Sequence, residues 1–188
     1  NNFIFNEESP TYPQTIYAKA KLSAEKYLMD LSKKNDLKIT IIRSPLVYGK
    51  NAKANLKKVF FLIRNGVPIP KINETNLRSF IAIDNLIDFI VTCMKSDSSS
   101  NKIYCITDSK DISVLQFFDL IASSLNKNIN YFNLNKYFLY SIFYIFGAKS
   151  SYHSIFSNLR MSTRKAQLEL NWKPVIQIDS AIKNYLIN

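Results

Sequence analysis

The chain has 188 residues, enough for one domain with a substantial core, and its 47% hydrophobic and 13% aromatic residues exclude intrinsic disorder. The formal net charge is +11, but the lysines are dispersed and no helix-turn-helix or zinc pattern occurs, which argues against nucleic-acid binding. A dispersed basic surface suits anionic substrates such as nucleotide diphosphates.

The first fifty residues predict a loop, a helix and a strand, in that order. Pro10 and Pro13 break regular structure in residues 1–14. Residues 15–34 carry alanine, leucine and tyrosine at helical intervals and predict a long helix. Residues 37–43 are apolar and β-branched, as in a strand that a parallel sheet buries on both faces. A helix followed by such a strand is typical of a doubly wound α/β fold.

The remaining residues predict further alternation of helices and strands. Gly66 would follow a helix over residues 55–65, Asp84 would cap a helix ending near Lys95, and Ser113 with Gln116 forms a capping box. That box would start a helix ending near residue 126. Further strands are predicted over residues 80–83, 102–107 and 129–134, and further helices over residues 137–146, 153–159, 162–170 and 179–187.

Several residue types limit the compartment and the chemistry. Cys93 and Cys105 lie in apolar segments, so we expect buried free thiols and a reducing, cytoplasmic compartment. The sequence has one histidine, His153, which argues against a multi-histidine metal site and a Ser-His-Asp triad, and no metal is expected. The most apolar stretch, residues 137–148, is shorter than the roughly 20 residues that span a bilayer, and we expect it to pack against the domain rather than contact a membrane.

Tyr17 and Lys21 form the most informative pair in the sequence. They lie four residues apart on the first predicted helix and therefore share one of its faces. A cation beside a phenol favours the charged form and lowers the pKa of the phenol, as a general acid/base working near neutral pH requires. By themselves the two residues fit an exposed amphipathic helix better.

Three further motifs follow this pair in a fixed order. They are residues 43–49 (Arg-Ser-Pro-Leu-Val-Tyr-Gly), residues 78–86 (beginning Arg-Ser-Phe-Ile) and a closing block over residues 165–174 that ends Asn-Trp-Lys-Pro. Together the four motifs resemble the extended short-chain dehydrogenase/reductase family, specifically its NAD-dependent nucleotide-sugar epimerases and dehydratases. The nearest branch makes UDP-N-acetylhexosamines and related deoxy sugars for bacterial surface polysaccharide. The resemblance runs from about Glu7 to the C-terminus.

The resemblance implies a role for each matching residue near the cofactor, NAD or NADP. Tyr17 would exchange a proton with the sugar hydroxyl, and Lys21 would bond the nicotinamide ribose. The backbone at Pro45 and Leu46 would meet the nicotinamide carboxamide, at the carboxyl edge of the strand where open α/β sheets bind ligands. Ala20 stands where the family commonly has serine, a departure that removes no proton carrier.

Other residues would bind the nucleotide sugar. Asn55 matches the residue that contacts the nucleotide diphosphate, and Lys53 adds positive charge beside it. Pro68 and Pro70 match the segment flanking the uracil. Arg78 matches an arginine that pairs with the diphosphate, for which its planar set of donors is suited.

The expected fold is α/β: the C-terminal part of a Rossmann-type doubly wound parallel sheet plus a smaller α/β substrate-binding lobe. Residues 1–50 would end the dinucleotide-binding domain, and residues 51–188 would form mainly the substrate lobe, with the chain crossing between the two. Trp172 would pack the closing helix onto that lobe. Only three glycines occur and none forms a Gly-x-x-Gly-x-x-Gly loop, so we expect the chain to be the C-terminal part of a longer enzyme and to be inactive on its own.

The implied activity is NAD(P)-dependent epimerisation at C4 of a UDP-hexose or UDP-N-acetylhexosamine through a 4-keto intermediate, in a homodimer. Two alternatives stay open. One is an NAD(P)H-dependent 4-ketoreductase of a UDP-4-keto-6-deoxy-N-acetylhexosamine, which would use the same Tyr17 and Lys21. The other is a non-catalytic interaction module.

Overall fold

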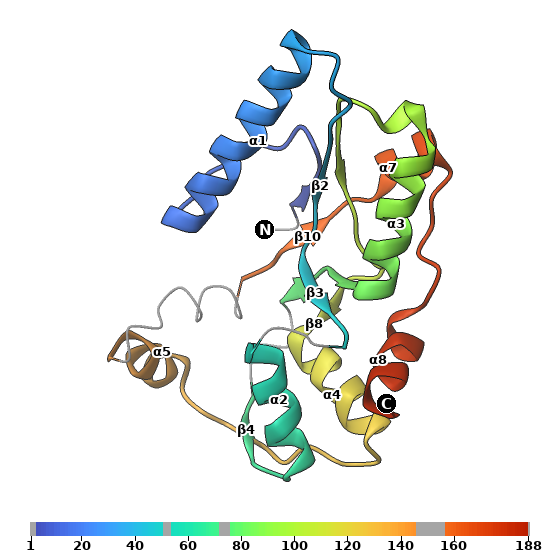
Figure 1. The fold of residues 1–188 in the computed structure, drawn as a ribbon. Coiled ribbons are helices and arrows are strands. Elements are labelled where there is room, and N and C mark those ends of the chain that lie inside the picture. The colour runs from blue at the N-terminus through green and yellow to red at the C-terminus, as the bar shows by residue number, and fades with distance from the viewer. Residues whose placement is uncertain (1–2, 51–53, 72–75, 146–156, 188) are drawn as a thin grey trace.

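The computed structural model describes residues 3–50, 54–71, 76–145 and 157–187, and it contains alternating helices and short strands (Figure 1). The helices are α1 (Ile16–Lys34), α2 (Ala54–Arg64), α3 (Ile83–Lys95), α4 (Val114–Ser124), α5 (Lys136–Ile145), α7 (Arg164–Leu170) and α8 (Ile178–Ile187). The strands are β1 (Ile4–Phe5), β2 (Thr40–Arg43), β3 (Leu46–Tyr48), β4 (Ile69–Pro70), β5 (Leu77–Arg78), β6 (Phe80–Ala82), β7 (Lys102–Cys105), β8 (Ile112–Ser113), β9 (Tyr131–Phe132) and β10 (Arg160–Met161).

The strands pair mostly in parallel. Strand β2 pairs with β7, β3 with β6, β1 with β10 and β4 with β9, whereas β5 and β8 are antiparallel. The chain passes from β6 to β7 through α3. Figure 1 shows α1 on one face of the β2–β7 pair and α3 on the other.

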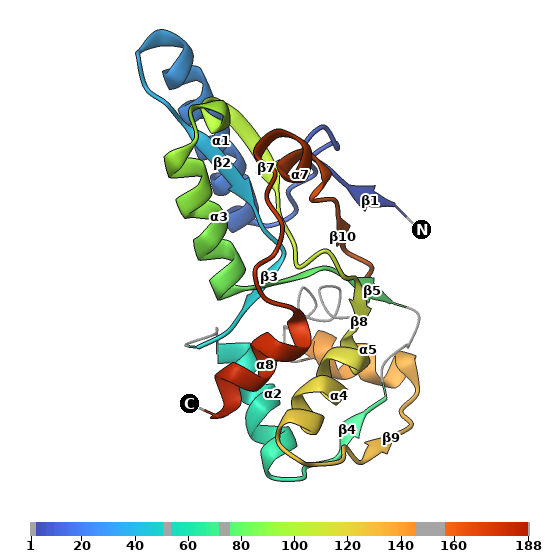
Figure 2. The same cartoon turned by 90° about the vertical axis from the view of Figure 1, so that its right-hand side faces the viewer.

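Two apolar clusters form the core. The α4 cluster lies among α2, α4 and α8, and its largest buried members are Tyr48, Phe80, Phe117, Ile63, Ile121 and Ile182. The α3 cluster lies between α3, β7 and the closing segment, and its buried members are Ile81, Phe89, Tyr104, Ile106, Ala166 and Trp172. Figure 2 shows the groups of helices above and below β3.

Strand β6 joins these two clusters because its side chains alternate between faces. Phe80 and Ala82 belong to the α4 cluster, and Ile81 between them belongs to the α3 cluster. All three are buried, which explains why this segment reads as a continuous apolar run. Beyond β3, Gly49 has a φ of +144°, and a Cβ there would lie 2.4 Å from Cγ2 of Ile83, so this close approach needs glycine.

Several predicted elements are confirmed with shorter strands than expected. Thr15 caps α1 through its Oγ1, which accepts from the backbone of Ala18 at 3.1 Å. Both hydrogen bonds of the Ser113–Gln116 capping box are present. Both cysteines are free, Cys105 buried and Cys93 half-buried. Among the described helices none is long and apolar enough to cross a bilayer.

One predicted contact, the cap at Asp84, is wrong, and the predicted packing of Trp172 onto the substrate lobe stays a prediction. Asp84 does not cap α3, whose N-cap residue is Ala82; its carboxylate accepts a hydrogen bond from the Tyr185 hydroxyl at 2.6 Å instead. Trp172 packs in the α3 cluster, 5.0 Å from the ring of Phe89, because its indole nitrogen donates to Asp88 on α3. The helix predicted over residues 153–159 falls mostly outside the described residues, together with His153.

Candidate active site

Helix α1 presents the Tyr17–Lys21 pair at its first turns. The side chains share a face as the spacing predicts, and the Lys21 ammonium lies 5.8 Å from the centre of the Tyr17 ring, within cation–π range. Tyr17 is 67% exposed and Lys21 is exposed, so both can reach a bound molecule. The structure therefore places a phenol and a cation together at an accessible position.

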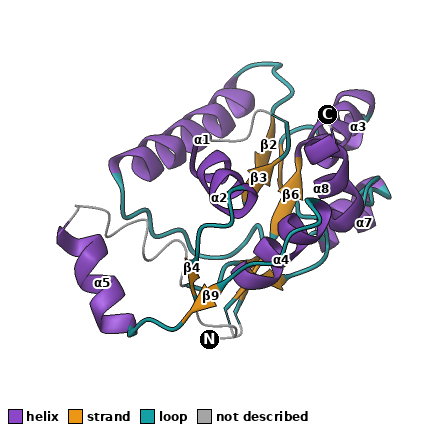
Figure 3. Ribbon diagram, turned by 90° about the horizontal axis from the view of Figure 1, so that it is seen from below, coloured by secondary structure: helices purple, strands orange, loops and turns teal. Residues whose placement is uncertain are grey.

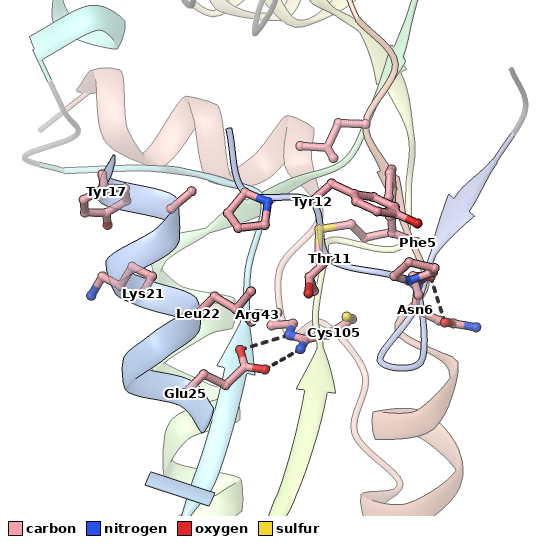
Figure 4. Close-up of a pocket in the computed structure, with 16 residues that line it drawn as sticks. Phe5, Asn6, Thr11, Tyr12, Tyr17, Lys21, Leu22, Glu25, Arg43 and Cys105 are labelled. Carbon is pink, nitrogen blue, oxygen red and sulfur yellow. Dashed lines mark hydrogen bonds and ion pairs between the residues drawn. The ribbon is translucent and has the colours of Figure 1, made fainter. Parts of the chain in front are cut away.

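A cavity of about 440 Å³ lies beside this pair. It is lined by residues of the loop before α1, of α1 itself and of the ends of β2, β7 and β10: Phe5, Asn6, Ser9, Pro10, Thr11, Tyr12, Pro13, Tyr17, Ala18, Lys21, Leu22, Glu25, Arg43, Cys105, Leu159 and Met161. Figure 4 shows many of these side chains. Because Arg43 and Cys105 end their strands, the cavity opens at the carboxyl edge of a parallel pair, where α/β folds bind ligands.

Side chains alternate between the two faces of β2 and β7, and this alternation brings Arg43 and Cys105 to the cavity. Ile42 and Tyr104 are register partners and join the α3 cluster on one face. Arg43 and Cys105, the next partners, line the cavity on the α1 face. A one-residue shift in register would exchange the two sets.

The floor of the cavity holds an ion pair that the sequence analysis did not single out. Both oxygens of Glu25 accept from Arg43, one of them from Nε at 3.1 Å, and Arg43 Nη1 donates to the backbone oxygen of Glu7 at 3.0 Å (Figure 4). Hydrogen bonding to Glu25 raises the pKa of Arg43. Glu25 follows Lys21 by four residues, and this repeated spacing is the sequence signal that could have found it.

Cys105 contributes a neutral side chain to the wall of the cavity and is not a nucleophile. Burial raises the pKa of its thiol to about 12, with the nearby Glu7 carboxylate acting in the same direction. A thiol attacks only as its thiolate, so Cys105 stays neutral at physiological pH. Its backbone N–H donates to Oε1 of Glu7 at 2.7 Å.

The other predicted cofactor residues lie just past β2. Pro45 is buried and Leu46, the first residue of β3, is exposed. Neither is among the residues that line the cavity. Their predicted contact with the nicotinamide stays a prediction.

None of the predicted substrate residues in the described part of the chain lines this cavity. Lys53 lies outside the described residues, and Asn55 lies in the first turn of α2, where its side chain is not described. Pro68 is exposed and Pro70 belongs to β4, which pairs with β9. Figures 1 and 2 place β4 at the end of the molecule opposite α1. The roles of these four residues stay predictions.

Arg78 is connected by its backbone to the wall of the cavity. Its backbone bridges to Leu159, which lines the cavity wall. The side chain is buried, donates from Nη1 to the backbone oxygen of Ser157 at 2.7 Å, and has its pKa lowered by desolvation. Strand β5 thus carries a largely desolvated cation behind the wall formed by residues 159–161.

A second buried polar group ties the two clusters together. The carboxylate of Asp108 accepts from the Tyr48 hydroxyl at 2.6 Å, from Asn85 Nδ2 at 2.7 Å and from the backbone N–H of Ala82. Asn85 also exchanges two hydrogen bonds with the backbone of Ile176. Burial raises the pKa of Asp108 despite these donors. Its full set of partners marks this group as structural.

Two curated proteins are similar in sequence to this chain. The chain is 29% identical over 181 residues to UDP-glucose 4-epimerase of Vibrio cholerae, covering 95% of this chain and 55% of that protein. It is 27% identical over 126 residues to the N-acetyl-alpha-D-glucosaminyl-diphospho-ditrans,octacis-undecaprenol 4-epimerase of Escherichia coli O157:H7, covering 66% and 38%. The chain therefore spans about half, or less, of the length of these curated relatives.

A solved structure shows the same fold. The UDP-N-acetylglucosamine 4-epimerase of Bacillus cereus superposes with a TM-score of 0.77 at 16% identity, covering 98% of this chain and 58% of that one. This likeness confirms the predicted α/β fold of Rossmann type. Residues 2–107, more than half of the chain, match the family described as NAD dependent epimerase/dehydratase, and the chain belongs to that family.

Proposed function

We propose that the protein is an enzyme that interconverts the C4 epimers of a UDP-hexose or UDP-N-acetylhexosamine with NAD or NADP. The observation that carries the proposal is the accessible Tyr17–Lys21 pair beside a cavity at the carboxyl ends of β2 and β7. Two of the similar proteins, from V. cholerae and B. cereus, are named as 4-epimerases of UDP sugars.

The residues at the cavity fit the nicotinamide end of such a cofactor. Lys21 offers an exposed ammonium that can donate to ribose hydroxyls, and the aromatic and aliphatic side chains of Phe5, Tyr12 and Met161 give an apolar wall. When bound, the cofactor supplies the oxidation and reduction at the sugar carbon. Tyr17 accepts the proton of the C4 hydroxyl as the carbonyl forms and returns it when the hydroxyl is restored. Lys21 orients the phenol and stabilises its charged form.

Further parts of the proposal concern binding and context. We place Lys53, Asn55, Pro68, Pro70 and Arg78 at the nucleotide diphosphate and base, and Pro45 and Leu46 at the nicotinamide. A cytoplasmic homodimer that serves surface polysaccharide synthesis agrees with the free thiols and with the lipid-linked substrate in the name of the E. coli O157:H7 relative.

The test uses the complete natural protein with UDP-glucose and UDP-N-acetylglucosamine. We expect the C4 epimer to appear, by nuclear magnetic resonance of the sugar, without added NAD(P)H and without its net consumption. No epimer from either substrate, with the protein folded and cofactor supplied, would contradict the proposal.

A second candidate is the 4-ketoreductase. The chain is 22% identical over 184 residues to dTDP-4-dehydro-6-deoxyglucose reductase of Escherichia coli, covering 95% of this chain and 53% of that protein. A reductase would oxidise NAD(P)H in proportion to the keto sugar consumed. The stoichiometry of cofactor oxidation therefore separates the two candidates.

A further inference from the structure

Helix α1 contributes little to the apolar core of the described residues. No residue of α1 belongs to either core cluster of the described residues. Ile16 is 88% exposed, and Tyr27 and Leu28 are exposed as well. Hydrophobic burial therefore does little here to fix the position of the helix that carries Tyr17 and Lys21.

The Glu25–Arg43 ion pair attaches α1 to strand β2. It joins α1 to the end of β2 by a two-oxygen contact, the geometry in which a guanidinium holds a carboxylate most firmly. The side chains of Arg43 and Glu25 are only 22% and 17% exposed, so water screens the pair less than a surface ion pair. The third contact of Arg43 reaches Glu7, whose carboxylate receives the backbone N–H of Cys105.

Helical spacing connects this ion pair to the proton carrier. Tyr17, Lys21 and Glu25 follow one another at intervals of four residues, so they lie along one side of α1. Holding Glu25 against the sheet fixes both the rotation of the helix about its axis and its position along that axis. Figure 4 shows Glu25 pointing from α1 to Arg43, with Lys21 and Tyr17 in the turns before it.

We propose that Glu25 and Arg43 are positioning residues, which act through α1 to hold the Tyr17 hydroxyl and the Lys21 ammonium in their catalytic geometry. This inference rests on the proposed function, because it assigns Tyr17 as the proton carrier. Neither residue transfers a proton itself. Small displacements of a reacting group lower turnover far more than they lower substrate binding at a distance.

Two substitutions separate positioning from simple electrostatics. Arg43→Lys keeps the charge and loses the planar set of donors, whereas Glu25→Gln keeps the shape and loses the charge. In the complete protein we expect each substitution to lower kcat about tenfold or more and to leave KM for the UDP sugar within about twofold. Both substitutions should shift the midpoint of the pH profile of kcat, and the two shifts should have the same direction. The double variant should be little worse than either single variant, since both remove one contact.

Asp111→Asn provides a matched control. The Arg160–Asp111 pair has a 2.8 Å contact and side chains 24% and 19% exposed, so it resembles the Glu25–Arg43 pair in burial but makes no contact with α1. We expect Asp111→Asn to lower the melting temperature about as much as Glu25→Gln and to leave the pH profile unchanged. Equal effects of both variants on kcat and the pH profile would overturn the proposal.

Hydrogen exchange tests the same point without any activity measurement. Backbone amides of α1 should exchange faster in Glu25→Gln and Arg43→Lys than in the wild type, while those of α3 and α4 keep their protection. In Asp111→Asn the α1 amides should be unaffected. Unchanged α1 exchange in both variants overturns the positioning role, whereas a wild-type protein without epimerase activity overturns only the proposed function.

Discussion

Helix α1 and helix α3 flank the same pair of strands but are held in different ways. Helix α3 buries Phe89 among Tyr104, Trp172 and Ile81, and its stability comes from apolar packing. Helix α1 keeps most of its side chains exposed and is joined to the sheet by the Glu25–Arg43 ion pair. The proposed chemistry lies on the helix that contributes less to the core, so stability and activity can be perturbed separately in this fold.

The largest effect on stability is expected at Phe89 of α3. Phe89→Ala should lower the free energy of unfolding by about 3–5 kcal/mol, because a buried ring and its contacts are lost. Ile87→Ala, at an exposed position of the same helix, and Ile16→Ala on α1 should each change it by less than about 0.5 kcal/mol. Urea titration measures all three, and a large effect of Ile16→Ala would show that α1 has a core of its own.

The largest effect on activity is expected on α1. Tyr17→Phe should lower kcat at least about a hundredfold while the melting temperature stays unchanged, because an acid/base is lost from an exposed position. Tyr27→Phe is the control, since Tyr27 is also 67% exposed and lies on the same helix. Near-normal turnover of Tyr17→Phe would exclude Tyr17 as the proton carrier.

A third prediction concerns the buried cation on β5. Arg78→Ala should weaken the binding of UDP more than that of uridine, by roughly 1.5–3 kcal/mol, because a charge-assisted contact with phosphate would be lost. Arg64→Ala, at an exposed position on α2, should weaken neither. Calorimetric titration with both ligands decides the point, and equal weakening of the two would show that Arg78 does not touch the diphosphate.

The buried carboxylate of Asp108 should make stability depend on pH. Its pKa in the folded protein is raised, so the unfolded chain ionises first and the contribution of this group to stability falls as the pH rises above 3.8. Asp108→Asn lacks this dependence. The free energy of unfolding of the wild type relative to the variant should therefore fall with rising pH, by about 1.4 kcal/mol for each unit of the shift. Urea titrations from pH 4 to 7 that keep this difference constant would show that the pKa is not raised.

The smallest effect is expected at the helix caps. Ser113→Ala removes the capping box of α4 and should cost about 1 kcal/mol of global stability, since α4 packs in the core. Thr15→Ala removes the cap of α1, and we expect faster amide exchange in the first turn of α1 with a smaller change in global stability. A larger loss of global stability from Thr15→Ala would reverse the comparison between the two regions.

Local signals predicted more of the molecule than distant ones. The Ser113–Gln116 box and the face shared by Tyr17 and Lys21 each depend on residues within four positions of one another. The ion pair of Glu25 with Arg43 spans 18 residues, and the contact of Glu7 with Cys105 spans 98. The sequence analysis did not find these pairs, because neighbouring residues do not specify which distant partner a side chain meets.

Competition between local and distant partners explains the wrong prediction at Asp84. The residue has the right type and place for a cap, but its carboxylate bonds the hydroxyl of Tyr185, 101 residues away. Trp172 shows a distant contact of the same kind, since its indole nitrogen donates to Asp88, 84 residues away. Only the folded chain selects such distant partners.

Spacing along the chain was enough to predict most of the helices, the alternation of helices and strands, and the face shared by Tyr17 and Lys21. The order of the four motifs was enough to indicate the family. The tertiary structure alone decided that β2 lies beside β7, so that Arg43 and Cys105 face α1 while Ile42 and Tyr104 face α3. It also decided that a single guanidinium joins α1, β2 and Glu7. These contacts depend on how strands far apart in the sequence align, and the two-residue period of a strand turns that alignment into a choice of face.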